Sequence, residues 1–229
     1  MQKQEATILS AELSGFQSLA ENLSPKEIAP LMGGLHELIA NTTRLHQGSI
    51  NRFTGDTFLA VFYMDKTGNS ASINAVDAVF ELKDRLGSLA QEKKLPAQFE
   101  LKVGIASGNI ISGDIGSGDK KQETIMGEAV NHANRICQFA GEGQILVDDN
   151  THEMVRDNCE FQILEPIPLK GSDKTLGVFE LLGKKRIKLK PEEFSKRKIS
   201  SEMVGRNKEM ELVEVHIKKL NAGEGSVVN

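Results

Sequence analysis

The sequence predicts an α+β protein with a ferredoxin-like βαββαβ core, followed by an additional C-terminal helix and further strands. Two observations lead to this class. Segments of alternating or continuous apolar residues, typical of strands, are interleaved with segments whose apolar residues recur every three to four positions, typical of helices. Their order from the N-terminus is strand, helix, two strands, helix, strand. We therefore expect an antiparallel sheet with its helices on one face.

The first strand and the first long helix have clear boundaries. Residues 6–13 form an apolar run typical of a strand, which a glycine ends. Ser24-Pro-Lys-Glu27 is a capping box with proline in the first helical turn. A helix is therefore predicted to begin there and to end near His46.

A β-hairpin is predicted next. Residues 51–54 and 57–62 are strand-like, and the Gly55-Asp56 pair between them is typical of a tight turn. Asp56 has two interpretations at this stage. It is either a turn-forming residue or a carboxylate that a rigid turn presents to a metal or a cation.

The remaining elements follow the same two periodicities. One helix is predicted where apolar residues recur at positions 73, 76, 79, 80, 82 and 86, and another over residues 128–139. The glycine at position 108 is expected to turn the chain between two strands. Strands are predicted at residues 99–105, 109–115, 145–147, 161–164 and 178–182.

Composition and charge exclude several classes of function. The chain has 229 residues, no tryptophan and one tyrosine, so platforms for stacking nucleic-acid bases are scarce. A net charge of −4 argues against a general binder of nucleic acid or membranes, and no apolar run is long enough to span a bilayer. Cys137 and Cys159 have no metal-site or redox spacing, and Cys137 is expected in the core. A cytoplasmic protein without a signal peptide fits these observations.

The domain organisation changes near the C-terminus. Residues 1–183 form the main predicted domain. Residues 184–203 are assigned as a basic linker, because Lys184–Lys198 holds eight Lys or Arg residues in fifteen. Contact of this segment with acidic lipid or RNA is the less favoured alternative. Residues 204–229 contain a new helical pattern and are assigned as the start of a truncated further domain.

Polar residues at strand ends and on one helix form the candidate site. Glu12 ends the first strand, and in a ferredoxin-like sheet that strand neighbours the hairpin that carries Asp56. Two carboxylates beside backbone N–H groups at Gly15 suit a Mg²⁺ ion that also binds a polyphosphate. Asn131 and Arg135 are four residues apart and share a helix face. Arginine can clamp a phosphate and asparagine can hold a sugar or base edge.

Each residue also has a structural interpretation: Glu12 as a surface carboxylate, Asn131 as a buried structural amide, and Arg135 as a salt-bridge partner. The arrangement as a whole resembles the catalytic domain of class III nucleotidyl cyclases over about residues 6–183. Five motifs occur in the family's order. They are Ala11–Phe16, Arg52–Asp56, Val103–Gly116, Ile125–Arg135 and Leu169–Gly171.

The resemblance implies the conversion of ATP to cyclic AMP and pyrophosphate. It makes Glu12 and Asp56 the ligands of two Mg²⁺ or Mn²⁺ ions, which assist attack by the ribose 3′-hydroxyl. By the same resemblance Asn131 orients the ribose and Arg135 stabilises charge on the pentavalent phosphorus. A homodimer in which each active site is shared between two chains is also implied.

Further residues are assigned to the substrate by this resemblance. Arg52 lies where adenylate cyclases carry a base-reading lysine, and Thr124 lies at the second base-reading position. Lys170 is expected to meet the terminal phosphates, and the backbone at Gly15 and Phe16 to cradle the phosphate chain. A cation at position 52 can donate to adenine N1 but would face the N1–H of guanine, which favours ATP.

Two positions depart from the family pattern. Glu12 replaces an aspartate, and the additional methylene moves its carboxylate by about one bond length, a displacement that can cost roughly 10²-fold in rate. Arg52 replaces lysine, which is not a conservative change at a shaped site. A degenerate cyclase-like module that regulates an attached domain is therefore the alternative function. A purely structural ferredoxin-like interaction domain is the third hypothesis.

The C-terminal segment carries a second, shorter resemblance. Residues 203–212 are similar to the lead-in of a signal-transduction ATPase domain, and no phosphate-binding Gly-x-x-x-x-Gly-Lys-Ser/Thr loop occurs in the sequence. This resemblance predicts an attached ATPase-like domain in a longer protein.

Overall fold

The computed structural model describes residues 2–21, 23–64, 70–92, 100–115, 122–169 and 175–185. All of them belong to one compact unit, Met1–Lys185. The predictions for Lys170, for the linker beyond Lys185 and for residues 204–229 lie outside the described residues.

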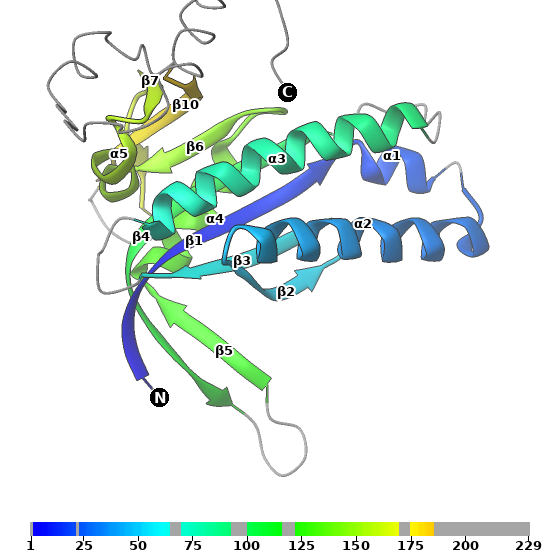
Figure 1. The fold of residues 1–229 in the computed structure, drawn as a ribbon, viewed down its shortest axis with the longest axis horizontal. Coiled ribbons are helices and arrows are strands. Elements are labelled where there is room, and N and C mark those ends of the chain that lie inside the picture. Colours follow the sequence, from blue (N-terminus) through cyan, green and yellow to red (C-terminus); the bar gives the residue numbers. More distant parts are fainter. Residues whose placement is uncertain are drawn as a thin grey trace, which may run out of the picture. The chain divides into compact units, whose positions relative to one another are not determined.

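A twisted eight-stranded sheet runs through this unit (Figure 1). The strand β1 (Gln2–Ser14) pairs along its whole length with β4 (Glu100–Ile115), from Gln2 opposite Ser112 to Ser14 opposite Glu100. The short strand β5 (Gln122–Gly127) pairs only with β4. In spatial order the other strands are β2 (Ser49–Thr54), β3 (Thr57–Tyr63), β1 (Gln2–Ser14), β4 (Glu100–Ile115), β6 (Ile145–Asp148), β10 (Val178–Lys184) and β7 (Cys159–Ile163).

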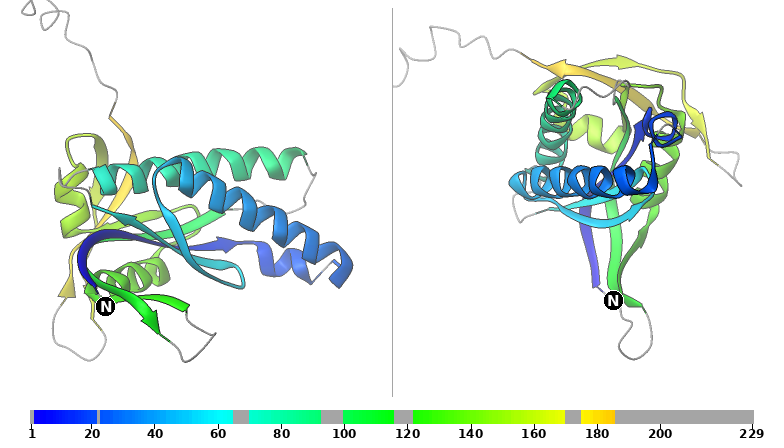
Figure 2. Two further views of the ribbon diagram at one scale, coloured as in Figure 1. Left: turned by 60° about the horizontal axis from the view of Figure 1, so that its bottom comes forward. Right: turned by 90° about the vertical axis from the view of Figure 1, so that its right-hand side faces the viewer.

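Helices cover both faces of the sheet (Figures 1 and 2). The long helices α2 (Pro25–Leu45) and α3 (Ser70–Glu92) lie on one face, and α4 (Glu128–Phe139) packs on the other. None of the helices in the described part of the chain combines the length and apolar character needed to cross a bilayer. The smaller elements are α1 (Phe16–Ala20), α5 (Asp149–Val155), β8 (Ile167–Pro168) and β9 (Thr175–Leu176).

The expectation of an antiparallel sheet with helices on one face is therefore wrong in two respects. The strands β4 and β6 run parallel, and α4 makes the crossover that a parallel pair requires. In addition, β1 is apolar on both faces. Leu9 and Ala11 face α2 and α3, whereas Ala6 and Ile8 face α4. A strand with two apolar faces needs a layer on each side to exclude water.

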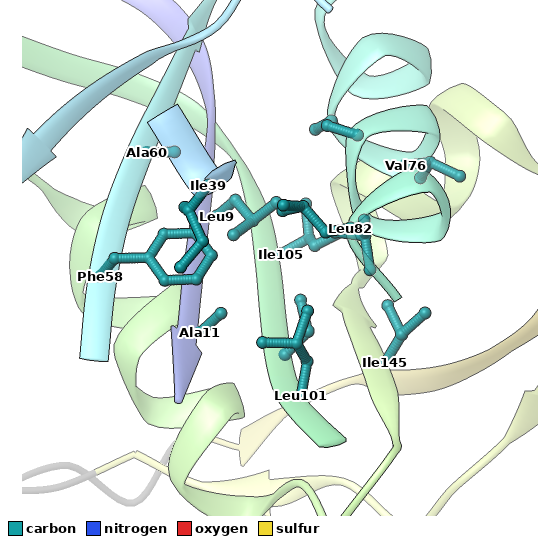
Figure 3. Packing of buried hydrophobic residues seen from close by; sticks show 14 of the residues in the cluster. Leu9, Ala11, Ile39, Phe58, Ala60, Val76, Leu82, Leu101, Ile105 and Ile145 are labelled. Atoms are coloured by element: carbon teal, nitrogen blue, oxygen red, sulfur yellow. The ribbon is translucent and has the colours of Figure 1, made fainter. Parts of the chain in front are cut away.

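The larger core lies between the sheet and the two long helices (Figure 3). Side chains of β1, β3 and β4, such as Leu9, Phe58 and Ile105, meet Ile39 of α2 and Leu82 of α3. Each of these side chains is at least 97% buried. Burial of one such side chain contributes about 1.5–3 kcal/mol, which fixes the strands that carry the candidate site.

The helix α4 approaches the sheet closely over Gly104 of β4. A Cβ atom at this position would overlap the backbone of Ala133 and Cys137 on α4 and would lie 3.0 Å from Cys137 Cα. Only glycine leaves room for the helix at this distance. The height of α4 above the sheet is thus set by one residue of the central strand.

Several predicted elements are confirmed and others are corrected. The capped helix α2, the β2–β3 hairpin and the range of α4 match the predictions. The predicted turn at Gly108 is wrong, because β4 continues through it and Gly108 pairs with Ala6. Pairing with the long strand β1 outweighs the weak strand preference of one glycine. The pattern also missed β5 and α5.

Candidate active site

The two candidate metal ligands are brought together by the hairpin and the first strand. Glu12 near the end of β1 is registered with Thr57, the first residue of β3. The amide of Leu13 donates to the carbonyl of Asp56 at 2.9 Å. The turn is closed by Gly55, whose φ of 61° favours a residue without a Cβ atom. The backbones of Glu12 and Asp56 therefore lie next to each other at one end of the sheet.

The carboxylate of Glu12 already has a cationic partner. Lys102 of β4 is registered with Glu12, and its Nζ lies 2.9 Å from Glu12 Oε1. The hydrogen bond to Glu12 raises the pKa of Lys102, so the ammonium stays charged. Both side chains are about one third exposed, so solvent weakens the pair. The charge of Glu12 is nonetheless balanced from within the chain.

The carboxylate of Asp56 has no hydrogen bond or ion pair with any other described residue. Among the described residues no three His, Cys, Asp or Glu side chains gather as a metal site. Mg²⁺ commonly uses one or two protein carboxylates and takes its remaining ligands from water and phosphate. Glu12 and Asp56 fit this pattern in residue type and placement, with Lys102 competing for the first of them.

An open groove of about 370 Å³ lies beside this pair, on the sheet face that α4 covers. Ser10 of β1 is registered with Leu59 of β3, and Leu59 with Arg52 of β2, so the three share one face. Asn134 of α4 also lines the groove. The guanidinium of Arg52 is exposed and makes no ion pair or hydrogen bond with another described residue. The guanidinium of Arg52 can therefore donate hydrogen bonds to a ligand in the groove.

The helix α4 presents the other two predicted catalytic residues. Its apolar residues pack on the sheet, while Asn131 is exposed and Arg135 is partly buried. The guanidinium carbon of Arg135 lies 4.6 Å from the centre of the Phe139 ring, and its Nε donates to the carbonyl of Pro168 at 3.4 Å. No described contact joins Asn131 or Arg135 to Glu12 or Asp56. Within one chain, the carboxylates and this helical pair are therefore not joined by a direct contact.

The remaining predicted residues lie around these elements. Gly15 follows β1 with a φ of 81°, and Phe16 begins α1 and is partly buried. Thr124 lies on β5, which approaches β2, the strand of Arg52. Lys170 lies outside the described residues.

Three residues that sequence reasoning missed belong to this region: Ser10, Lys102 and Asn134. Ser10 and Glu12 are two residues apart on a strand, which places them on one face, and Asn134 immediately precedes Arg135. These spacings were available signals. The Lys102 contact depends on which strand pairs with β1 and in what register, and the local pattern does not contain that information.

The known proteins that this chain resembles include cyclases. Residues 1–183 match the family model described as the adenylate and guanylate cyclase catalytic domain. A relative named adenylate cyclase 1 from Rhizobium meliloti is 24% identical over 185 residues, which cover 79% of this chain and 28% of that protein. The chain thus spans less than a third of the length of that relative.

Solved structures show the same fold. The adenylyl cyclase CyaB from P. aeruginosa matches with a TM-score of 0.76 and 22% identity, over 81% of this chain and 97% of that one. The guanylyl cyclase Cya2 matches with a TM-score of 0.73 and 25% identity, over 82% and 96%.

Proposed function

The chain belongs to the family of adenylate and guanylate cyclase catalytic domains, and from this premise we propose that it is an adenylate cyclase that converts ATP to cyclic AMP and pyrophosphate. The observation that carries this choice is the unpartnered guanidinium of Arg52 in a groove whose described lining holds no carboxylate. Adenine N1 accepts a hydrogen bond from such a cation, whereas guanine presents an N1–H donor. The similar solved structures include an adenylyl cyclase and a guanylyl cyclase, so this similarity does not decide between ATP and GTP.

Two residues of α4 are assigned to the ribose and the α-phosphate. Asn131 orients the ribose so that its 3′-hydroxyl faces the α-phosphate, and Arg135 donates to the phosphoryl oxygens as charge develops. Arg135 must leave the Phe139 ring and the Pro168 carbonyl to do so, contacts that cost little to break in a partly exposed place.

The phosphates and metals are assigned to the other end of the site. Glu12 and Asp56 would hold two Mg²⁺ or Mn²⁺ ions, which supply Lewis-acid activation of the 3′-hydroxyl and neutralise the triphosphate. The backbone at Gly15 and Phe16 cradles the phosphate chain, and Lys170 meets its terminal phosphates. Thr124 completes base recognition with its hydroxyl.

A homodimer with two shared sites is part of the proposal. Asn131 and Arg135 make no described contact with the carboxylates of their own chain, which supports a site completed by a second copy. The β4–β5 ribbon, which projects from the sheet in Figure 1, carries Ile111 and Met126 as a cross-strand pair. Each is 42% exposed, and such an apolar pair is suited to burial in an interface.

The wider setting is also proposed. The two free cysteines are buried and unpaired, which is compatible with the cytoplasm. An ATPase-like domain follows the basic linker in the full-length protein.

One observation favours a second function. The ion pair between Glu12 and Lys102 supplies internally the charge that a metal would supply. A degenerate module that binds nucleotide weakly and regulates an attached domain would keep such a pair.

Product formation from ATP and from GTP, with Mg²⁺ or Mn²⁺, tests the proposal. We expect cyclic AMP from the parent chain, little product from Asp56→Ala, and parental rates from Asp157→Ala, a control that removes an exposed carboxylate far along the chain. Absence of product from a folded parental dimer would exclude the enzyme and favour the degenerate module. A parental rate for Asp56→Ala would instead exclude the metal assignment.

A further inference from the structure

Asn134 is held in one orientation at the edge of the groove. The hydroxyl of Ser10 donates to Asn134 Oδ1 at 2.9 Å. Ser10 is only 8% exposed, so water competes weakly for this bond. The amide is planar and its oxygen is engaged, so the two Nδ2 hydrogens lie on its other branch. No described residue accepts a hydrogen bond from them.

The groove therefore offers donors from two sides. Arg52 on β2 and Asn134 on α4 both line it, and neither donor group has a partner among the described residues. Leu59, which is 2% exposed, lines the groove from the face of the sheet that α4 covers. Thr57 uses its hydroxyl hydrogen on the carbonyl of Thr54 at 2.8 Å. One buried leucine with hydrogen-bond donors beside it complements a heterocycle that carries acceptors on its rim.

We propose that Asn134 is a further specificity-determining residue for the purine base, whose Nδ2 group donates to N3 of adenine beside Arg52. Ser10 is its positioning residue, because the bond to Oδ1 fixes which end of the amide faces the base. This inference rests on the proposed cyclase function and deepens it. Adenine presents N1 and N3 as acceptors on either side of C2–H, so Nδ2 can donate to N3 while Arg52 donates to N1. Guanine carries the donor N1–H and a C2 amino group beside N3 along the same edge, whereas N7 is an acceptor in both bases.

The inference predicts distinct effects for three substitutions in the full chain. Asn134→Ala removes the donor and should weaken binding of the adenine nucleotide about 5- to 10-fold, the range of one hydrogen bond. Asn134→Asp keeps the shape but replaces the donor by an acceptor, and should shift the ATP-to-GTP preference at least about 10-fold toward GTP. Ser10→Ala should reduce that preference by about 2- to 5-fold, because the amide can then rotate.

Fluorescent 3′-deoxy analogues of ATP and GTP are the probes, because they lack the attacking hydroxyl and report binding without turnover. The matched control is Gln138→Ala. Gln138 lies one turn after Asn134 on α4, is exposed and does not line the groove, so this change also removes a side-chain amide. Thermal unfolding of each variant checks that the fold is retained, and Asn134→Asp carries the test if the alanine variant does not fold.

The outcomes separate this inference from the proposed function. Selective loss of the ATP analogue in Asn134→Ala, together with the shift toward GTP in Asn134→Asp and parental behaviour of Gln138→Ala, supports it. Equal weakening of both analogues, or no change in either, overturns the role of Asn134 and leaves the cyclase proposal standing. A parent that binds neither analogue overturns both.

Discussion

Replacing Gly104 by alanine is predicted to lift α4 from the sheet and to damage both stability and catalysis. The added Cβ would overlap the Ala133 carbonyl oxygen and the Cys137 amide nitrogen and would lie 3.0 Å from Cys137 Cα. Carbon atoms in good contact are about 3.5–4.0 Å apart, so the helix must retreat by roughly 0.5–1 Å. The obstructing atoms are helix backbone, so no side-chain rotation relieves the overlap.

The magnitude follows from this displacement. Overpacking of a core costs about 1–3 kcal/mol, and we expect the upper half of that range because the obstruction is rigid. For a unit of this size the melting temperature should fall by about 4–12 °C. A shift of about 1 Å at Asn131 and Arg135 should also lower the turnover by roughly 10²-fold.

Thermal unfolding followed by circular dichroism, together with cyclic AMP formation, provides the assay. Gly87→Ala on α3 is the matched control, because a Cβ there meets nothing within 4 Å. It should gain about 0.4–1 kcal/mol from reduced freedom of the unfolded chain. A Gly104→Ala protein that melts with the parent would refute the claim that this glycine sets the height of α4.

Three further predictions concern single side chains. Glu12→Asp shortens the side chain by one methylene, releases the contact with Lys102 and should raise cyclase turnover at least about 10-fold with Mg²⁺; a slower variant would contradict this. Burial raises the pKa of the Asp148 carboxyl in the folded protein above its value in the unfolded chain. The protonated carboxyl therefore contributes its full stabilisation below the unfolded pKa, and this stabilisation is lost as the pH rises through the folded pKa. The parent should therefore lose stability relative to Asp148→Asn as the pH rises above about 4 in urea titrations, and a constant difference would argue against it. Burial also raises the pKa of Cys137 to about 11, and that of Cys159 is raised by the same cause, so a thiol reagent at pH 8 should label neither until urea is added; fast labelling of the native protein would disprove this.

Much of the candidate site could be placed on its helices and strands from the sequence, because the signals for those elements are local. The capping box beginning at Ser24 and the Gly55 turn specify their elements with neighbouring residues only. The family motifs likewise placed Asp56 on the hairpin and Asn131 on α4.

The rest depends on pairing between distant segments. Nothing local to Glu12 reveals that Lys102 will lie opposite it, and nothing local to Asn134 reveals that Ser10 will fix its amide. The second apolar face of β1 was visible in the sequence, but its meaning depends on a helix more than a hundred residues later. Register and layer assignment are properties of the assembled sheet.

The pairing of β1 with β4 also has a consequence for synthesis on the ribosome. Gln2 pairs with Ser112, and Ser14 with Glu100, so β1 gains this neighbour only after β4 has been synthesised. At about 5–20 residues per second, β1 spends roughly 5–20 s with one backbone edge unpaired. Contacts this distant in the chain also slow folding itself. The nascent protein should therefore depend on chaperones during this interval, and the strand that carries Glu12 is the segment they would need to shield.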